Sequence, residues 1–364
     1  MKIAINALPY TSYQGIESFL AGLLRSWPET GDEITVFANE KSAAFLKPLP
    51  SHIKLEVKHF SNLNRLHLFG YQQLRLPQIL KKEKFDFLFC PSLDSPWLFS
   101  KKIVALYDAA PFIFKKESSL IGKMYWRSCL FFAKNFSQEI ITISEFSRHE
   151  LSQHLHIKAE KIKVIYGGLP TLPSPTKEAN KDSEPINKPY FIAIGNARAR
   201  KNLETLIKAR LEASGKFQDC ELLIIGKMDK SMEKLVALAG PGIRFTGFVD
   251  EQEKYRLLAG AQALIFPSLY EGFGIPILEA QISKIPVLCS DIPAFREVAA
   301  DSALFFDGKN TKDINDKINQ LINQPELAAR LVAQGEINAR RFSWEKSSKQ
   351  LIDLIHQHEN ITNK

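Results

Sequence analysis

Short apolar runs alternate along this chain with longer segments whose apolar residues are spaced three and four apart. In the first half, such runs occur at residues 3–5, 34–37, 53–57, 85–89, 103–106, 140–143 and 162–165. The first run leads into a loop that contains Pro9, Tyr10 and Gly15, and apolar positions from Ile16 to Leu24 then follow at helical spacing. Strands that alternate with helices in this way predict a parallel sheet with helices on both faces.

The alternation stops once and then starts again. Residues 170–189 contain five prolines and almost no large apolar side chains, as is typical of a linker. Beyond them, strands are expected at 190–194, 222–225, 243–245, 263–266, 287–288 and 303–306, with helices from residues 203, 251, 276 and 294. We therefore expect an N-terminal domain over residues 1–170, a linker over 171–189 and a second doubly wound domain over 190–342. A closing helix over 343–364, capped by Ser343, is expected to pack back on the first domain.

The composition of the chain predicts where the protein is located and whether its thiols are reduced. The chain has 364 residues, of which 45% are hydrophobic, enough to bury two cores. It contains neither a signal peptide nor a run of about 18 apolar residues, so a cytoplasmic protein is expected. The cysteines stand singly, several of them in apolar surroundings, which predicts reduced and mostly buried thiols at positions 90, 129, 220 and 289.

Charge is distributed unevenly between the halves. Residues 1–170 hold 22 Lys and Arg against 15 Asp and Glu, a net +7, whereas residues 171–364 hold 26 against 25, a net +1. The first half therefore favours an anionic partner such as a membrane surface or a phosphate-bearing lipid, although a merely soluble basic surface would look the same. The basic pairs Lys81-Lys82, Lys101-Lys102 and Lys115-Lys116, with aromatic residues at 125–132 nearby, could touch lipid head groups, although such residues are more often solvated faces and core aromatics. No nucleic-acid partner is expected.

The most informative stretch is residues 267–280, which follow an apolar run and contain Gly272, Gly274 and Pro276. Glycines allow a ligand to approach the backbone closely, and proline suits the first turn of a helix. The stretch predicts a strand, a loop and a helix whose first N–H groups can bind an anion. The carboxylates of Glu271 and Glu279 flank this anion site and can bind polyol hydroxyls.

A second candidate follows the strand at 190–194. Arg198, Arg200 and Lys201 precede a helix, where cations oppose the helix dipole, so a compensating anion such as a diphosphate is expected. The alternative is a solvated basic loop. Because the spacing Gly-x-Gly-x-x-Gly is absent, a dinucleotide cofactor is not supported.

Weaker candidates also lie at expected strand ends. Phe248 and Val249 could receive a flat base by stacking, although such residues are also common in cores. Asp108 follows the strand at 103–106 and has no evident capping partner, whereas Ser144 is explained as a helix cap. A metal site is not supported, because the paired histidines are two residues apart and no Asp-x-Asp occurs.

Residues 266–280, Phe-Pro-Ser-Leu-Tyr-Glu-Gly-Phe-Gly-Ile-Pro-Ile-Leu-Glu-Ala, resemble the signature of glycosyltransferase family 4, with Glu271 and Glu279 as its Glu-x7-Glu pair. Residues 141–147, 200–203, 245–249, 290–298 and 342–344 extend the resemblance over nearly the whole chain. It implies the GT-B fold, an α/β architecture in which two Rossmann-like, doubly wound parallel-sheet domains face each other across a cleft. The first domain would bind the acceptor and the second the nucleotide-sugar donor.

The resemblance also implies roles for individual residues. Lys201, with Arg200 and the nearby Arg198, would bind the donor diphosphate, Glu279 the ribose and Glu271 the transferred sugar. The loop from Gly272 through the N–H groups of Phe273, Gly274 and Ile275 would meet the sugar and phosphates, Phe248 and Val249 would surround the base, and Gly15 would let its loop close over the diphosphate. Asp108 is a further catalytic candidate, but Tyr107 stands where many relatives have histidine.

The implied function is transfer of a mannose-like or glucose-like hexose, with retention of configuration, from a GDP-, UDP- or dTDP-linked donor. The acceptor would be a glycan or a lipid-diphosphate-linked sugar in surface polysaccharide biosynthesis, and neither a cofactor nor a metal is expected. Two other classes stay open: a catalytically silent GT-B subunit that binds a nucleotide sugar, and a sugar-nucleotide epimerase. The sugar, the nucleotide and the linkage are not encoded in any pattern we can interpret.

Overall fold

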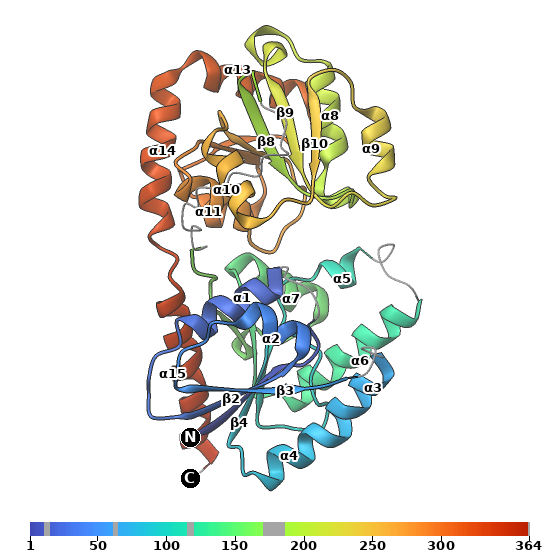
Figure 1. Cartoon of the computed structure of the whole chain (residues 1–364), viewed down its shortest axis with the longest axis vertical. Helices are drawn as coiled ribbons and strands as arrows, with labels where there is room; N and C mark the ends of the chain where they lie inside the picture. Colours follow the sequence, from blue (N-terminus) through green and yellow to red (C-terminus); the bar gives the residue numbers. More distant parts are fainter. Residues whose placement is uncertain (11–14, 61–64, 115–119, 170–185, 363–364) are drawn as a thin grey trace. The chain divides into compact units, whose positions relative to one another are not determined.

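The computed structural model describes residues 1–10, 15–60, 65–114, 120–169 and 186–362 (Figure 1). The chain divides into two compact units. Unit 1 consists of Met1–Gly168 together with Phe342–Lys364, and unit 2 of Leu169–Arg341. Most of the expected linker, residues 171–185, lies outside the described residues.

Unit 1 is built on a seven-stranded parallel sheet in the order β3-β2-β1-β4-β5-β6-β7. Each strand expected from the apolar runs of the first half is present. The bounds are β1 Lys2–Ala7, β2 Glu33–Asn39, β3 Ile53–Lys58, β4 Phe87–Cys90, β5 Lys102–Ala105, β6 Glu139–Thr142 and β7 Ile162–Val164. The strand order reverses at β1, which pairs with β2 on one side and β4 on the other. Ligands of open parallel sheets bind at the carboxyl ends of strands at such a reversal.

Helices cover both faces of this sheet. Alternate side chains of β1 enter two separate cores: Ile3 and Ile5 pack with α1, whereas Ala4 packs on the other face with Leu76 and Leu80 of α4. The bounds are α1 Gly15–Arg25, α2 Glu40–Leu46, α3 Arg65–Gly70, α4 Leu76–Lys82, α5 Ala110–Ile113, α6 Leu120–Phe136, α7 Glu145–Leu155 and α15 Trp344–Thr362, with a π-helical turn η2 at Tyr71–Arg75 and a 3-10 turn η4 at Ala159–Lys161.

The closing helix α15 packs on α1 within unit 1. Ser343 caps it by accepting a hydrogen bond from the Lys346 backbone N–H at 3.3 Å, as expected from the sequence. The Trp344 ring lies edge-on to Phe19 at 5.5 Å between centroids. A Cβ atom at Gly22 would stand 2.3 Å from this ring, so only glycine leaves room for the tryptophan.

One of the residues expected at a basic membrane surface is inside unit 1. Lys102 is fully buried, and its Nζ donates to the carbonyls of Pro96, Trp97 and Phe99 at 2.6, 3.0 and 2.6 Å. The expectation was therefore wrong for Lys102: its ammonium group organises the loop between β4 and β5. Lys115 and Lys116 lie outside the described residues, whereas Lys81 and Lys82 are exposed on α4.

Unit 2 has a six-stranded parallel sheet in the order β10-β9-β8-β11-β12-β13, which reverses at β8. The expected strands and helices of the second half are all present. The strands are β8 Tyr190–Ile194, β9 Glu221–Ile225, β10 Ile243–Gly247, β11 Leu264–Phe266, β12 Val287–Ser290 and β13 Leu304–Phe306. The helices are η5 Ala199–Lys201, α8 Leu203–Leu211, η6 Gly215–Asp219, α9 Glu233–Leu238, α10 Glu251–Ala259, α11 Ile275–Ile282, α12 Pro293–Ala299, α13 Thr311–Asn323 and α14 Pro325–Ala339.

Candidate functional site

The candidate site of unit 2 lies where its strand order reverses. The loop after β8 leads into the 3-10 turn η5, and the loop after β11 leads into α11. Asn202 joins these two loops to each other and to the loop after β13: its Nδ2 donates to the carbonyl of Pro267 at 3.0 Å and to that of Gly308 at 2.6 Å. The Leu269 N–H also donates to the Arg200 carbonyl at 2.8 Å. Residues about 70 positions apart in the sequence are thereby held at one sheet edge.

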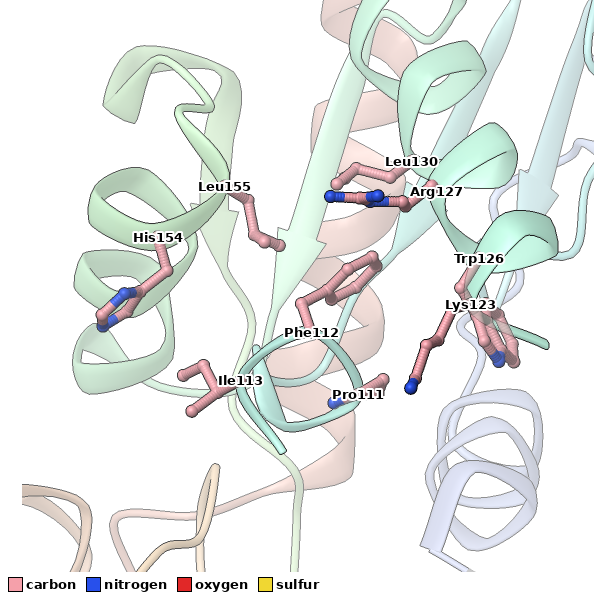
Figure 2. Close-up of a pocket in the computed structure, with 9 residues that line it drawn as sticks. All are labelled: Pro111, Phe112, Ile113, Lys123, Trp126, Arg127, Leu130, His154 and Leu155. Atoms are coloured by element: carbon pink, nitrogen blue, oxygen red, sulfur yellow. The ribbon is translucent and has the colours of Figure 1, made fainter. Parts of the chain in front are cut away.

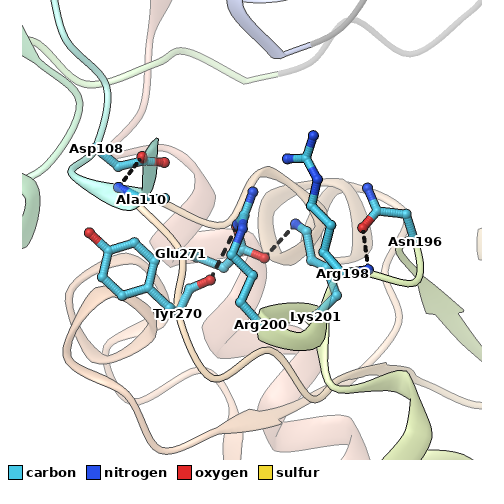
Figure 3. Close-up of polar contacts among 8 residues, drawn as sticks. All are labelled: Asp108, Ala110, Asn196, Arg198, Arg200, Lys201, Tyr270 and Glu271. Atoms are coloured by element: carbon cyan, nitrogen blue, oxygen red, sulfur yellow. Dashed lines mark hydrogen bonds and ion pairs between the residues drawn. The ribbon is translucent and has the colours of Figure 1, made fainter. Parts of the chain in front are cut away.

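Lys201 and Arg200 converge on Glu271 at this edge (Figure 3). The Lys201 Nζ lies 2.5 Å from one carboxylate oxygen of Glu271, and an Arg200 guanidinium nitrogen lies 3.4 Å from the other. All three side chains are at most one-fifth exposed, so solvent screens these contacts only partly. Two cations and one carboxylate thus form a compact cluster with a net positive charge.

This cluster revises the argument made from the basic loop. The anion that compensates Arg200 and Lys201 in the structure is Glu271 of the chain itself, where the sequence alone suggested a diphosphate. Arg198 does not join the cluster. Its side chain is exposed and points away from Glu271 in Figure 3, while its backbone N–H donates to the Asn196 side chain at 3.2 Å.

The glycine loop before α11 has the geometry expected of it. Gly274 has φ of +123°, a conformation that residues with a Cβ atom rarely adopt. A Cβ atom there would also stand 3.1 Å from the Phe295 ring. Phe273 is buried, and α11 begins at Ile275 with Pro276 in its first turn. Helix α11 therefore begins at Ile275, shortly after Glu271 in the sequence.

Glu279, one turn into α11, is paired with a lysine that sequence reasoning missed. The Nζ of Lys254, on α10, lies 2.8 Å from Glu279 and 2.8 Å from Glu251. Glu279 is only 6% exposed, and burial raises its pKa while Lys254 opposes that shift. No local pattern marks Lys254 as special, because the contact joins two helices that are 25 residues apart in sequence.

Phe248 and Val249 follow β10, as predicted. Phe248 is 81% exposed, so its ring is available for stacking rather than packed in a core. Gly247 before it has φ of +76°, and Asp250 after it caps α10 by accepting from the Glu253 N–H at 2.8 Å. The exposed Phe248 ring therefore lies on a short turn between Gly247, the last residue of β10, and Asp250, the N-cap of α10.

The candidates in unit 1 behave differently. Asp108 does have a local partner, contrary to expectation: its Oδ1 accepts a hydrogen bond from the Ala110 N–H at 2.8 Å (Figure 3). An aspartate commonly bonds the N–H two residues later in this way, and here it starts helix α5. Tyr107 donates its hydroxyl to the Pro91 carbonyl at 2.8 Å and packs edge-on against Phe19, so it is held by the interior of unit 1. Burial raises the pKa of Tyr107 well above its ordinary value.

Gly15 is the first residue of α1, and a Cβ atom placed on it would meet nothing within 4 Å. Nothing in the described part of the chain thus requires glycine at this position. Residues 11–14 before it lie outside the described residues.

Two family descriptions match consecutive parts of the chain. "Glycosyltransferase Family 4" matches residues 13–171, and "Glycosyl transferases group 1" matches residues 176–338. The chain belongs to glycosyltransferase family 4. This enzyme therefore transfers a hexose from a nucleotide-sugar donor to an acceptor, as the resemblance implied.

Relatives and solved structures agree with this assignment. An O-antigen chain mannosyltransferase of Salmonella typhimurium is 27% identical over 274 residues, which is 74% of each chain. Another O-antigen chain mannosyltransferase, from Escherichia coli, is 26% identical over 274 residues, 72% of each chain. The sucrose-phosphate synthase of Thermosynechococcus elongatus has the same fold, with a TM-score of 0.75, 16% identity and 99% of each chain covered. The glycosyltransferase thus has the GT-B fold.

Other expectations for the glycosyltransferase concern its thiols, caps and surface. Each cysteine is free and buried, as predicted. Ser144 caps α7 by accepting from the Ser147 N–H at 2.9 Å, which also confirms a prediction. Among the described residues, no three His, Cys, Asp or Glu side chains are grouped as metal ligands would be. The described helices include none that is both long and apolar enough to cross a bilayer.

Proposed function

We propose that this glycosyltransferase is a retaining, metal-independent mannosyltransferase that extends a lipid-linked surface polysaccharide from a nucleotide-activated mannose. The cluster of Arg200, Lys201 and Glu271 carries the proposal, because it combines cations for a diphosphate with a carboxylate for sugar hydroxyls at the sheet edge where ligands bind. The names of the two O-antigen relatives support mannose and a surface polysaccharide.

In the proposed complex, the donor diphosphate takes a place beside Lys201 and Arg200, and Glu271 turns an oxygen to a sugar hydroxyl. Glu279, held by Lys254, accepts from the ribose, and the base stacks on Phe248. Asp108 is proposed as a further catalytic group and Arg198 as a further contact for the diphosphate. Gly15, as the family resemblance implies, lets its loop close over the diphosphate.

The chemical step breaks the bond between the sugar C1 and the diphosphate oxygen, and forms a bond between C1 and the acceptor oxygen on the same face. The acceptor proton passes to the leaving phosphate oxygen, so no protein nucleophile takes part. Negative charge grows on the diphosphate as the bond breaks, and two fixed cations lower the energy of that charge. This role for Arg200 and Lys201 makes a divalent metal unnecessary.

The test is hexose transfer in the presence of EDTA, with NMR assignment of the anomeric configuration of the product. GDP-, UDP- and dTDP-linked sugars are compared, with a membrane fraction carrying lipid-linked glycan as the acceptor. Lys201→Met should lower kcat/KM about 100-fold or more, since removing one group that stabilises transition-state charge costs about 3–4 kcal/mol. Glu271→Gln should lower it similarly.

Lys208→Met and Glu204→Gln are matched controls, because these residues form an exposed ion pair on α8 of the same unit. They should leave transfer unchanged. An inverted product or loss of activity in EDTA contradicts the proposed mechanism. A silent subunit would transfer nothing with any donor, and an epimerase would form product without an acceptor.

We also propose that unit 1 contacts the membrane peripherally on the cytoplasmic side. Its net positive charge supports this, as do the exposed apolar side chains of α6, Leu120, Ile121 and Met124.

A further inference from the structure

Unit 1 contains a cavity of about 570 Å³ between α5, α6 and the end of α7 (Figure 2). Phe112 of α5, Leu130 of α6 and Leu155 of α7 give it an apolar wall. A volume of this size and a mostly apolar lining are typical of sites for small organic ligands. Helix α5 starts two residues after Asp108, so the cavity adjoins the sheet edge where the acceptor is expected.

Two cations on α6 border the cavity. Lys123 and Arg127 lie one turn apart and share a helix face with Trp126 and Leu130. Figure 2 shows the Arg127 guanidinium reaching across the cavity and the Lys123 ammonium near its opposite side. Within the described part of the chain, neither cation forms a salt bridge with a carboxylate. His154 of α7 also lines the cavity, but its ring is already paired with Glu150, 3.3 Å away.

The adjoining face of α6 is apolar and exposed. Leu120, Ile121 and Met124 are 73%, 81% and 64% exposed. Large apolar side chains gathered at such exposure usually mark a contact with another molecule or a membrane. They stand in the first two turns of α6, the helix that also supplies Trp126 and Leu130 to the cavity lining, so a hydrocarbon chain that leaves the cavity could contact them.

We propose that this α5–α6 cavity binds the lipid phosphate of the acceptor, with hydrocarbon against Phe112, Leu130 and Leu155 and phosphate oxygens at Lys123 and Arg127. The proposal rests on the proposed function, from which the lipid-linked acceptor comes. Charge complementarity selects an anionic amphiphile: a neutral lipid leaves both cations without a partner, and a free phosphate leaves the apolar wall exposed.

The test uses farnesyl diphosphate, a soluble prenyl diphosphate, titrated into the full-length protein without donor. Trp126 lines the cavity and its emission reports binding, while the Trp126→Phe variant shows the signal of the other tryptophans. We expect a saturable change that Trp126→Phe abolishes. Inorganic diphosphate and farnesol should each bind at least about tenfold more weakly, since each supplies only one part of the interaction.

Lys123→Gln and Arg127→Gln should each weaken farnesyl diphosphate binding about tenfold or more, as expected for loss of a charge-assisted hydrogen bond. Lys158→Gln is the matched control, because Lys158 is an exposed lysine of unit 1 that does not line the cavity. Equal effects of Lys123→Gln and Lys158→Gln would mean unspecific attraction and would overturn the proposal.

Vesicles of anionic phospholipid separate the cavity from a bilayer contact. If they alter Trp126 emission while farnesyl diphosphate does not, the proposal is wrong. Because the titration contains no donor, farnesyl diphosphate can bind even if mannose transfer fails. Conversely, transfer to a lipid-free glycan by a protein that does not bind farnesyl diphosphate overturns the cavity assignment alone.

Discussion

The ion pair between Lys254 and Glu279 allows a quantitative test that does not depend on substrate. Replacing Lys254 by Met leaves the Glu279 carboxylate, 6% exposed, without its closest cation. Removing one partner of a buried ion pair typically costs 3–5 kcal/mol. Glu279 can limit that cost by binding a proton. Keeping a glutamate of ordinary pKa about 4.3 protonated at pH 7 costs about 1.4 kcal/mol per pH unit, or about 3.7 kcal/mol.

The sign of the pH dependence follows from the direction of the shift. Burial raises the pKa of Glu279, and removal of Lys254 takes away the charge that opposes this rise. A carboxyl whose folded pKa lies above its unfolded value loses stability as pH rises between the two values. Lys254→Met should therefore lower the free energy of unfolding by about 3 kcal/mol at pH 7, and this loss should shrink toward pH 5. The double variant Lys254→Met/Glu279→Gln should show no such dependence on pH.

Urea unfolding at pH 5, 6 and 7 measures this loss of unfolding free energy. The tryptophans all lie in unit 1, so their fluorescence is an internal control, whereas far-UV circular dichroism reports both units. Lys208→Met, which breaks an exposed pair, should cost at most about 1 kcal/mol. A loss below about 1 kcal/mol for Lys254→Met, or a deficit independent of pH, would refute the reasoning.

Two further predictions concern packing. Gly22→Ala puts a Cβ atom 2.3 Å from the Trp344 ring and should destabilise unit 1 by about 1–3 kcal/mol, measured by tryptophan fluorescence in urea; an unchanged transition would show that α15 shifts at no cost. Gly15→Ala on the same helix meets no atom within 4 Å, so stability should change by less than about 1 kcal/mol while donor affinity in calorimetry falls; unchanged affinity would place the diphosphate elsewhere. A third prediction concerns the thiols, all of which are buried, at Cys90, Cys129, Cys220 and Cys289. Because burial raises the pKa of Cys90 and Cys129 to about 12, no thiol should react with Ellman's reagent near pH 8 until the protein unfolds. A fast reaction of the native protein would contradict this prediction.

Local signals in the sequence were sufficient for the strands and for several of the helices. The apolar runs located each strand, and Gly274 with Pro276 located the loop and the first turn of α11. Ser144 and Ser343 were recognisable as caps because their partners are three residues away. Asp108 was misjudged, although the bond to Ala110 two residues later is equally local.

Contacts between distant residues could not be deduced in the same way. The partner of Lys201 is Glu271, 70 residues later, and their pairing depends on which strands become neighbours in the sheet. No pattern near Lys254, on the helix expected from residue 251, indicates that Glu279 is its partner. Lys102 looked like part of a basic surface, because its sequence neighbour is also lysine and nothing nearby reveals that three carbonyls enclose it.

The return of α15 to unit 1 has a consequence for how the enzyme is made. Leu351, Ile352 and Ile355 of this helix belong to the same core as Phe19 and Leu20 of α1. Between them the ribosome must add all of unit 2, Leu169–Arg341, which at about 5–20 residues per second takes on the order of 10–30 seconds. Throughout that interval the nascent unit 1 exposes the apolar surface that α15 later covers. The domain synthesised first is therefore the last to be completed, because its core stays unfinished while unit 2 is made.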